Sequence, residues 1–413
     1  MNAVGKLTEL IARRKPGYSL DQAFYTDPEI FALDMERAVF PQWLMIDHVS
    51  RIPNPGDYFV HKIAGEEIIV VRGQDHEVRA FYNVCRHRGS RICREAEGNA
   101  KLLRCPYHAW SFDLEGNLRA ARLMDDDFNP DDFSLHKCHI GIGEGMIFLN
   151  LSKGEPPAFE DFIAPLRPYM QLHGLADARV AHRGAYPTEA NWKLVLENFF
   201  ECYHCQPSHP EYCQVHPPAY VLAYGGGRGS GPEEAEEAYQ PELDAFVARA
   251  ASMGHPTGAW GDDMAGTFWR GMDRMPIKDG WLSETADGTP AAPLMGQFND
   301  WDGGYTGVFS SPFATLLMTN DFATAFRFTP VSALYTEVDL LWLVRGDSEN
   351  GKDVDVDKMT WLWDVTTVAD KRIIEDNQAG VMSRMYRPGP YSRQEKAVEA
   401  LIQWYLERLG AVV

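Results

Sequence analysis

The segment CRHRGSRICREAEGNAKLLRCPYH, residues 85–108, contains two similar half-motifs suited to binding metal. CRH occupies residues 85–87 and CPYH occupies residues 105–108, so each half offers one thiol and one imidazole. A [2Fe–2S] cluster can use such a set, with two cysteines on one iron and two histidines on the other. Imidazole ligands raise the reduction potential of the cluster, which suits it to accept electrons. The cluster ligands that the segment predicts are Cys85, His87, Cys105 and His108.

A structural zinc ion is the alternative for the same four side chains, because two cysteines and two histidines also form a common zinc site. Zinc sites more often begin with a pair of cysteines, whereas both halves here pair cysteine with histidine. The pattern therefore favours the cluster. Seven cysteines are also an odd number for a disulfide scaffold. The remaining cysteines match no ligand spacing and are expected to be ordinary thiols: Cys93, Cys138, Cys202, Cys205 and Cys213.

Short β-strands are predicted on both sides of the cluster segment. DYFVHKIAG, EEIIVVRG and EVRAFYNV precede it between residues 57 and 84, and SFDLEGNL and GMIFLN follow it between residues 111 and 150. β-Branched and aromatic runs bounded by Gly and Asp are typical of small antiparallel sheets, and the EGN at 115–117 predicts a hairpin turn. Residues 40–155 are therefore predicted to form an all-β domain, after a helical segment at residues 1–39.

The rest of the chain, residues 156–413, is predicted to be a second domain of the α+β class, against which the N-terminal helical segment packs. Residues 322–346 indicate a β-hairpin or a β-meander. Residues 355–380 and 391–410 have the apolar spacing of helices. Residues 222–300 are rich in Gly, Asp and Glu without a sustained period, and we expect long loops there.

A second metal motif, NFFECYHCQPSH at residues 198–209, lies in this second domain. Glu201 and His204 are three positions apart and would share one face of a predicted helix. His209 follows His204 by five positions, a spacing that points the two imidazoles apart on a straight helix. Pro207 is expected to end the helix and to let His209 turn back toward His204. Two imidazoles and a distant carboxylate would form the facial triad of non-haem iron oxygenases, which leaves positions open for O2.

The pairing of the two motifs carries more weight than the second motif alone, because a single histidine on such a helix is more often a packed core residue. An iron that activates O2 needs electrons one at a time, and a cluster on the same chain supplies them. The spacing leaves the carboxylate ligand open. Its candidates are Glu197, Glu201, Asp364, Asp370, Glu375 and Asp376.

With these two motifs in this order, nearly the whole chain resembles the Rieske oxygenase family, the α subunits of ring-hydroxylating oxygenases and their demethylating relatives. The resemblance implies a Rieske β-domain at 40–155 and a catalytic, mononuclear iron domain built as a helix-grip antiparallel sheet. It places the third iron ligand on Asp370, preceded here by Ala rather than by the Glu of many relatives. It also implies that Glu201 links the iron of one subunit to His108 of its neighbour, with Asn198 beside the ligands.

Glu201 and the segment YRPGPYS at residues 386–392 resemble the quaternary-ammonium branch of this family, whose members act on betaines, choline and carnitine. This resemblance implies a monooxygenase that hydroxylates an N-methyl group, which is then lost as formaldehyde. The alternatives are an aromatic-ring-hydroxylating dioxygenase α subunit and an electron carrier of the ferredoxin kind, which needs only residues 40–155. Aromatic side chains hold such cations through cation–π attraction. The aromatic residues considered are Tyr203, Trp260, Phe309, Phe313 and Phe322.

The resemblance also implies partners. Electrons would come from NAD(P)H through a separate flavin and iron–sulfur reductase, and the oxygenase would assemble as a homotrimer that acts on O2 and a small quaternary ammonium compound. The net charge of −20 argues against nucleic acid as a partner. No run approaches the ~20 apolar residues of a membrane helix. The charged start with Pro16 does not resemble a signal peptide, so a cytoplasmic location is expected.

Overall fold

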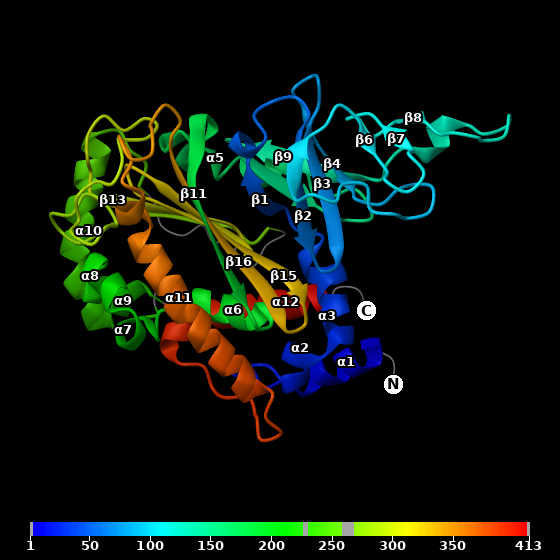
Figure 1. Ribbon diagram of the computed structural model, residues 1–413. Coiled ribbons are helices and arrows are strands. Elements are labelled where there is room, and N and C mark those ends of the chain that lie inside the picture. Colours follow the sequence, from blue (N-terminus) through cyan, green and yellow to red (C-terminus); the bar gives the residue numbers. More distant parts are fainter. Residues whose placement is uncertain (1–2, 226–229, 258–267, 411–413) are drawn as a thin grey trace.

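Two groups of antiparallel strands organise the chain, and the long helices gather around one of them (Figure 1). The computed structural model describes residues 3–225, 230–257 and 268–410. Within these residues, a seven-stranded and a three-stranded sheet come from the first part of the chain, and a six-stranded sheet comes from the second. The predicted α+β architecture, with a small all-β part and a helix-grip antiparallel sheet, is confirmed.

The first domain consists of short strands, as its sequence predicts. Its larger sheet has the strand order β1-β10-β9-β4-β3-β2-β5 and its smaller sheet the order β6-β7-β8. The predicted hairpin is the β7–β8 pair. Its turn requires Gly116, because φ is +92° there and a Cβ atom would lie 2.4 Å from the Phe81 ring. The strand bounds are β1 Leu44–His48, β2 Asp57–Ile63, β3 Glu66–Arg72, β4 Val78–Tyr82, β5 Glu97–Asn99, β6 Leu103–Arg104, β7 Ser111–Phe112, β8 Leu118–Ala120, β9 Lys137–Gly143 and β10 Met146–Asn150.

The second domain is built on the six-stranded sheet, which has the order β11-β16-β15-β14-β13-β12. The β15–β16 pair is the hairpin predicted at residues 322–346. Side chains alternate between the two faces of a strand, so Leu340 and Trp342 of β16 join one apolar cluster while Leu341 and Leu343 join the other. The strand bounds are β11 Ala178–Thr188, β12 Gly271–Pro276, β13 Gly304–Ser311, β14 Ala314–Met318, β15 Ala323–Ser332 and β16 Tyr335–Arg345.

The helix α11 runs across this sheet and packs against β11 and α6 (Figure 1). The two late helices predicted from the sequence are confirmed as α11 and α12. Among the residues described, no helix combines the length and apolar character needed to span a bilayer. The helix bounds are α1 Ala3–Arg13, α2 Gln22–Thr26, α3 Pro28–Asp34, α4 Phe159–Ile163, α5 Arg167–Leu172, α6 Trp192–Phe199, α7 Cys205–Ser208, α8 Pro210–Val215, α9 Pro218–Tyr224, α10 Glu233–Ser252, α11 Val356–Val381 and α12 Lys396–Gly410.

α10 is a helix where the sequence predicts loops, so the expectation of long loops across residues 222–300 was wrong in this part. Its sequence is rich in Ala and Glu, which favour helices, and acids occupy its first turn. The residues that it buries are Tyr239, Phe246 and Ala250. These are too few to create the apolar period by which a helix is recognised in a sequence.

The N-terminal helices contact the second domain and hold α6 in place. Lys193 of α6 forms a fully buried ion pair with Asp34, the last residue of α3. Tyr405 of α12 donates its hydroxyl proton to the same carboxylate at 2.6 Å. Arg37 donates to the backbone carbonyl of Leu409 at 2.8 Å. Three segments that are far apart in the sequence therefore meet at the start of α6.

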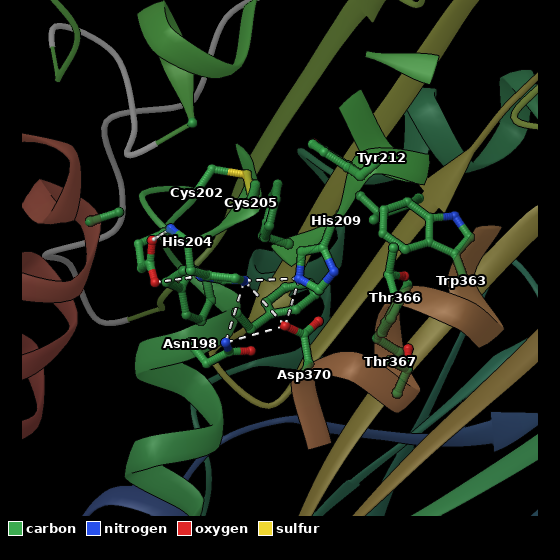
Figure 2. A pocket seen from close by; sticks show the side chains of 18 of the residues that line it. Asn198, Cys202, His204, Cys205, His209, Tyr212, Trp363, Thr366, Thr367 and Asp370 are labelled. Carbon is green, nitrogen blue, oxygen red and sulfur yellow. Dashed lines mark hydrogen bonds and ion pairs between the residues drawn. A yellow bond between two sulfur atoms is a disulfide. The ribbon is translucent and has the colours of Figure 1, made fainter. Parts of the chain in front are cut away.

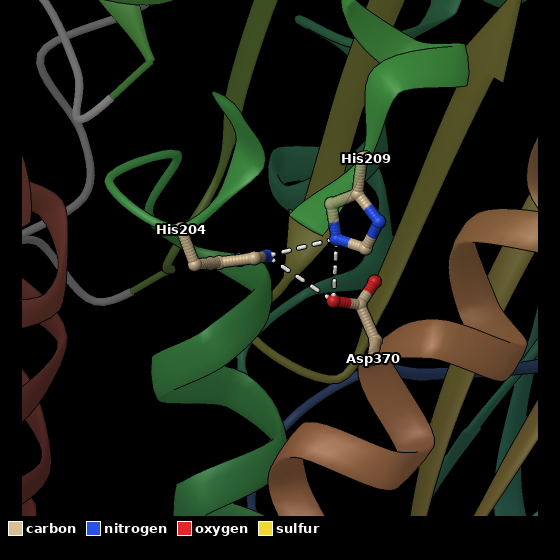
Figure 3. Close-up of side chains that lie close together, drawn as sticks. All are labelled: His204, His209 and Asp370. Atoms are coloured by element: carbon tan, nitrogen blue, oxygen red, sulfur yellow. Dashed lines mark hydrogen bonds and ion pairs between the residues drawn. The ribbon is translucent and has the colours of Figure 1, made fainter. Parts of the chain in front are cut away.

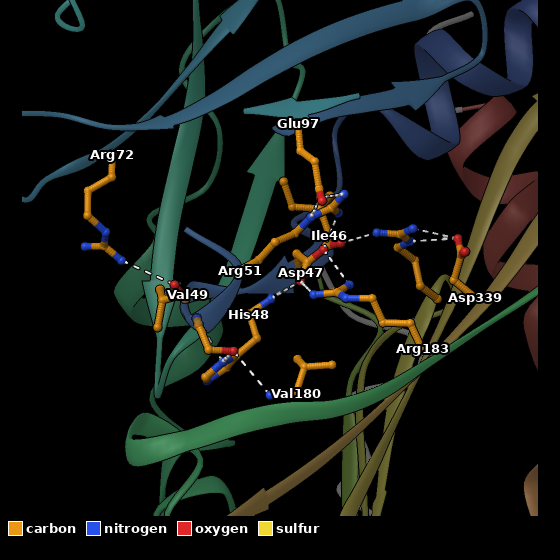
Figure 4. A network of polar contacts seen from close by, with 12 residues as sticks. Ile46, Asp47, His48, Val49, Arg51, Arg72, Glu97, Val180, Arg183 and Asp339 are labelled. Atoms are coloured by element: carbon orange, nitrogen blue, oxygen red, sulfur yellow. Dashed lines mark hydrogen bonds and ion pairs between the residues drawn. The ribbon is translucent and has the colours of Figure 1, made fainter. Parts of the chain in front are cut away.

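A buried charge network joins the two domains (Figure 4). Asp47 of β1 is fully buried and pairs with Arg51 at 2.7 Å and with Arg183 of β11 at 2.7 Å. Arg327 of β15 donates to the carbonyl of Ile46 and pairs with an acid of β16. Burial alone would raise the pKa of Asp47, but the hydrogen bond from Arg183 and the charges of the nearby arginines hold it below its ordinary value. The network ties the cluster domain to the six-stranded sheet of the second domain.

Candidate metal centres

α6 brings the second metal motif to the sheet, but it ends earlier than the sequence predicts. The side chain of Asn191 caps its start, and the helix ends at Phe199. The Glu201 carboxylate then accepts backbone N–H groups of the following turn, that of His204 at 3.2 Å. The prediction of one helix that reaches Pro207 was wrong, because a side chain that bonds its own neighbouring backbone competes with the helix.

His204, His209 and Asp370 converge on one point (Figure 3). The Nε2 atoms of the two imidazoles are 3.1 Å apart. Oδ1 of Asp370 lies 3.1 Å from Nε2 of His204 and 2.9 Å from Nε2 of His209. Two ligand atoms at right angles, each ~2.1 Å from a metal, are ~3.0 Å apart. The three atoms therefore have the spacing of one face of an octahedral site, and their donor set fits a ferrous ion with open positions.

The other acids that the spacing left open have partners elsewhere. A tyrosine hydroxyl donates to Glu197 at 2.9 Å and another donates to Asp364 at 2.6 Å. Glu375 accepts a backbone N–H at 3.0 Å, and Asp376 is exposed. Glu201 bonds Nδ1 of His204, which faces away from the point where the other three atoms converge.

Glu201 determines which nitrogen of His204 faces the convergence point. Its Oε1 lies 2.6 Å from Nδ1 of His204, so Nδ1–H donates to the carboxylate and Nε2 can serve a metal. Burial alone would lower the pKa of His204, but hydrogen bonds to Asp370 and Glu201 raise it to about 10. Burial would raise the pKa of Asp370, yet the hydrogen bonds from the two histidines hold it below its ordinary value. A metal cation at Nε2 would replace the proton that these acids attract.

Asn198, on the last turn of α6, lies beside this group. Its Nδ2 is 3.3 Å from Oδ1 of Asp370 and 3.4 Å from Nε2 of His204. An amide N–H at that distance can donate to the carboxylate and hold its orientation.

The two cluster loops share one backbone conformation. In the first loop, Gly89 donates to the carbonyl of Cys85 at 2.9 Å, and the N–H of Cys85 donates to the carbonyl five residues on at 2.9 Å. In the second, Ala109 donates to the carbonyl of Cys105 at 3.1 Å, and the N–H of Cys105 donates five residues on at 2.8 Å. Gly89 and Ala109 both have positive φ, +73° and +63°. The repeated Cys/His pattern therefore folds into two matching loops.

The side chains of the cluster motif lie together in two pairs, the two histidines and the two cysteines. The ring centroids of His87 and His108 are 4.6 Å apart, and both side chains are exposed. Cys85 and Cys105 are buried and are free of disulfides. Burial raises the pKa of Cys85, while backbone N–H groups of its loop oppose this shift by bonding the sulfur. Buried thiols with N–H donors and exposed imidazoles fit a [2Fe–2S] cluster that exchanges electrons at the surface.

Cys202 and Cys205 form a disulfide that brackets His204 in the sequence. The expectation that every cysteine outside the cluster motif is an ordinary thiol was wrong for these two. The turn after α6 brings their Cα atoms to 4.8 Å, within the range that a disulfide spans. Cys93, Cys138 and Cys213 are free thiols, as expected.

A cavity of about 140 Å³ opens onto the three converging side chains (Figure 2). None of its described lining residues is Lys or Arg. Such a wall can hold an apolar group or a cation against the convergence point. The aromatic lining residues are Phe199, Phe200, Tyr212, Tyr220, Tyr305, Phe309, Phe326 and Trp363.

Most of this wall was not predicted from the sequence. Of the aromatic residues considered for a cation, Phe309 lines the cavity. Tyr203 is 60% exposed, whereas Phe313 and Phe322 are buried in the apolar core. Trp260 lies outside the described residues.

One signal for the wall was present in the sequence of α11. Trp363, Thr366, Thr367 and Asp370 all line the cavity. Their offsets of three, four and seven place them on one face of a helix. The sequence could therefore have predicted that the helix face with the proposed carboxylate ligand, Asp370, continues to Trp363 and lines the same cavity.

The fold and the two sites define a class of protein, the oxygenase subunit with a Rieske cluster domain and a mononuclear iron domain. Residues 42–130 match the family described as Rieske [2Fe-2S] domain. Residues 175–411 match the family described as Ring hydroxylating alpha subunit (catalytic domain). The chain belongs to this family of oxygenase α subunits.

Within the family, the chain is similar to subunits of monooxygenases. It is 36% identical to the glycine betaine monooxygenase oxygenase subunit of Chromohalobacter salexigens, over 98% of this chain and 89% of that protein. It is 36% identical to the carnitine monooxygenase oxygenase subunit of Escherichia coli (strain K12), over 49% of this chain and 54% of that protein. Its fold is similar to that of the quaternary ammonium Rieske monooxygenase CntA, with a TM-score of 0.70, 22% identity, and 97% and 98% of the two chains covered.

Membership of this family establishes the biochemical class. The chain is the oxygenase subunit of an O2-dependent enzyme that uses a [2Fe–2S] cluster and a mononuclear iron, with electrons from a separate reductase. An electron carrier of the ferredoxin kind is excluded, because the match to the catalytic domain spans residues 175–411.

Proposed function

We propose that this oxygenase hydroxylates an N-methyl group of a small quaternary ammonium compound, such as a betaine, and removes that group as formaldehyde. The observation that carries the proposal is the aromatic cavity at the convergence point, whose described lining contains no Lys or Arg. A trimethylammonium group donates no hydrogen bond, so aromatic faces are what can hold it. Similarity to subunits named for glycine betaine and carnitine supports the same substrate class.

The size of the cavity favours a small substrate. Its volume of about 140 Å³ is close to that of a protein cavity of ~150 Å³ that binds benzene. A betaine is of similar size, whereas a fused aromatic ring system is larger than this space. The size therefore argues against a dioxygenase of fused aromatic rings, and the similarity to subunits named for glycine betaine and carnitine is what favours a betaine over a single aromatic ring.

We assign the metal ligands by the convergence of their side chains. When bound, the iron activates O2 and the cluster passes on the electrons of the reductase. Glu201 holds the Nδ1 proton of His204, and Asn198 donates toward Asp370. The aromatic wall keeps water away from the methyl group that reacts. The proposed ligands are His204, His209 and Asp370 for the iron, and Cys85, His87, Cys105 and His108 for the cluster.

We propose further that a second copy of the chain brings the two centres together, in a homotrimer. In Figure 1 the strands β6 and β7, beside the cluster loops, lie at the upper right, well away from α6 near the centre and from α7 at the lower left. Electrons that leave the cluster therefore have a better route into a neighbouring subunit. In this arrangement the exposed His108 of one subunit bonds Glu201 of the next, which already holds His204.

The reaction balances as R–N(CH3)3⁺ + O2 + 2 e⁻ + 2 H⁺ → R–N(CH3)2 + CH2O + H2O + H⁺. One oxygen atom enters the methyl group and the other leaves as water. The hydroxymethyl group then breaks its C–N bond, and the nitrogen keeps the electron pair. The electrons come from NAD(P)H through the reductase.

The test incubates the purified protein with a general reductase, NADH and a panel of glycine betaine, proline betaine, choline and carnitine. Formaldehyde is expected from at least one of them, in step with substrate loss. Asp370→Ala is the control that should produce none. If no member of the panel yields formaldehyde and an aromatic compound is oxidised instead, the dioxygenase alternative replaces this proposal.

A further inference from the structure

A buried acid that the proposed reaction does not use lies behind the aromatic wall. Glu284, between β12 and β13, is fully buried. Its Oε2 accepts the indole N–H of Trp363 at 3.1 Å. Its Oε1 lies 3.0 Å from Nε2 of His216, which is fully buried as well. Both oxygens of this carboxylate are therefore engaged by residues at or next to the cavity.

Trp363 stands between Glu284 and the cavity. It lines the cavity and precedes Asp370 on α11 by two helical turns. In Figure 2 its indole nitrogen points away from the three converging side chains, and this nitrogen meets Glu284. Groups joined by hydrogen bonds polarise one another, so a carboxylate that accepts the indole N–H makes the ring more electron-rich. The ring then attracts a cation in the cavity more strongly.

His216 extends the influence of the same acid to a second part of the wall. Tyr212 lines the cavity and stacks on His216, with ring centroids 4.3 Å apart. Tyr305 also lines the cavity and meets His216 edge to face at 5.0 Å. Glu284 thus bonds one aromatic residue of the wall directly and is one side chain removed from two others.

A cationic substrate needs a negative charge here because its neighbour is a metal cation. Two neutral imidazoles and one carboxylate leave a divalent ion with a net positive charge, which repels a trimethylammonium group in the same cavity. The carboxylates of Glu201 and Asp370 are engaged by the imidazoles. Glu284 supplies a further carboxylate on the opposite side of the wall. A neutral group of the same shape gains nothing from it.

We propose that Glu284, acting through Trp363 and His216, makes the cavity select a cation over a neutral group of the same shape. This role rests on the proposed function and deepens it, because it assigns the selectivity to one buried side chain. Glu284 does not touch the substrate. It is a positioning residue that sets the electrostatics of the aromatic wall.

Two probes of equal shape isolate the effect of the charge. Glycine betaine and 3,3-dimethylbutanoate share a carboxylate and a head of three methyl groups, and they differ by a cationic nitrogen in place of a neutral carbon. Their dissociation constants are measured by isothermal titration calorimetry on the iron-loaded protein, without reductase and without O2. The wild type is expected to bind glycine betaine more tightly, and Glu284→Gln is expected to lower that preference about tenfold.

Glu284→Gln is chosen because it can keep both hydrogen bonds. The amide oxygen accepts the N–H of Trp363, and the amide N–H donates to Nε2 of His216 when that ring carries its proton on Nδ1. Asp321→Asn is the matched control. Asp321 is fully buried too, but it is held by hydroxyl and backbone N–H groups and is not among the described lining residues of the cavity. Its replacement should leave the preference at the wild-type value.

Failure of the proposed function would be observed in the wild type, whereas failure of the role of Glu284 would be observed in the variant. A wild type that does not prefer glycine betaine overturns the proposed substrate class, and this role of Glu284 with it. A preference that survives in Glu284→Gln overturns the role of Glu284 alone. Should that variant not fold, Trp363→Phe, which keeps a ring in the wall but lacks the N–H, is expected to show the same loss. A preference lost in these variants and kept in Asp321→Asn supports the proposal.

Discussion

The convergence of His204, His209 and Asp370 depends on the contacts that hold each side chain. His209 is 3% exposed and is fixed by the packing around it. His204 is oriented by the bond between its Nδ1 and Glu201. Asp370 projects from a long helix and is 25% exposed toward the cavity. The carboxylate is therefore the member that can be removed with the least disturbance of the fold.

Replacing Asp370 by Ala should remove the mononuclear iron and leave the cluster. The purified wild type is expected to hold about three irons per chain and the variant about two, because the cluster retains its own pair. Iron determination and the visible absorption spectrum measure this. Asp376→Ala, which removes an exposed acid of the same helix, should keep the wild-type iron content. Loss of the cluster's colour in Asp370→Ala would contradict two separate sites.

Glu197 should make the folded chain less stable as the pH rises. Burial raises its pKa to about 8, against opposing contributions from Tyr25 and Lys193, and Glu395 adds to the increase. The folded chain then holds this proton more tightly than the unfolded chain, so stability falls between pH 4.5 and about 8.

Glu197→Gln should remove this part of the pH dependence. The side chain borders a second cavity of about 310 Å³, and access of water there limits the effect to ~2 kcal/mol at pH 8. At pH 8 the midpoint of unfolding of the variant should therefore lie at a higher urea concentration than that of the wild type. At pH 4.5 the two midpoints should be the same. Glu36→Gln, at an exposed glutamate, is the control that should not change the difference between the two pH values.

At the scale of residues, the sequence indicates which residues belong to the candidate sites better than it indicates which other residues they contact. The histidines and cysteines of both motifs could be nominated because few other residues bind iron at such spacings. The proposed third iron ligand, Asp370, could not be chosen by spacing, because it lies on α11, far from the histidines along the chain. Glu284 gave no signal at all, since an isolated acid in a loop looks like solvated surface.

At the scale of elements, predictions from the sequence succeeded where one apolar period dominates and failed where side chains act on the backbone. The β15–β16 hairpin and α11 have long regular patterns and were predicted. The end of α6 was not, because the carboxylate of Glu201 binds the next turn. α10 was missed because it buries so little of its surface.

The stability of the contact between the two domains should depend on Asp47. Asp47→Asn leaves the guanidinium groups of Arg51 and Arg183, which are 23% and 39% exposed, without their buried counter-charge, and the loss of these charge-assisted hydrogen bonds costs ~1.5–3 kcal/mol. A lower melting temperature by calorimetry is the expected result. Asp75→Asn is the control, because Asp75 forms an exposed ion pair with Arg79 and should leave the melting temperature unchanged. An equal decrease of the melting temperature in both variants would contradict a special role for the charge network between the domains.

At the scale of the whole molecule, the cavity is assembled from parts that no local pattern connects. Its wall takes residues from α6, α8, α9, β13, β15 and α11, and the fold alone brings these together. The candidate iron site also combines distant segments, and in Figure 1 the helices α6 and α7 that carry its histidine motif lie well away from the strands beside the cluster loops. The resemblance of the chain to a family predicted an assembly, and the separation of the centres gives that assembly a physical reason.

Electron transfer between subunits can be tested by mixing two inactive chains. Cys85→Ser should destroy the cluster and Asp370→Ala the iron site, so each variant alone should release no formaldehyde. Trimers that contain both variants, isolated by two different affinity tags after co-expression, have one junction in which an intact cluster faces an intact iron site. They should recover about one third of the wild-type rate, because one of three junctions works.

The direction of transfer gives the sharpest form of this test. Glu201→Gln placed in the chain that lacks the cluster should abolish the recovered activity, because that chain supplies the working iron and its bridge. The same substitution in the chain that lacks the iron should have no effect, since only the cluster of that chain is used. Homotrimers of the two variants mixed after purification are the control for exchange and should remain inactive. Recovery that ignores which chain carries Glu201→Gln would show that electrons do not cross through this residue.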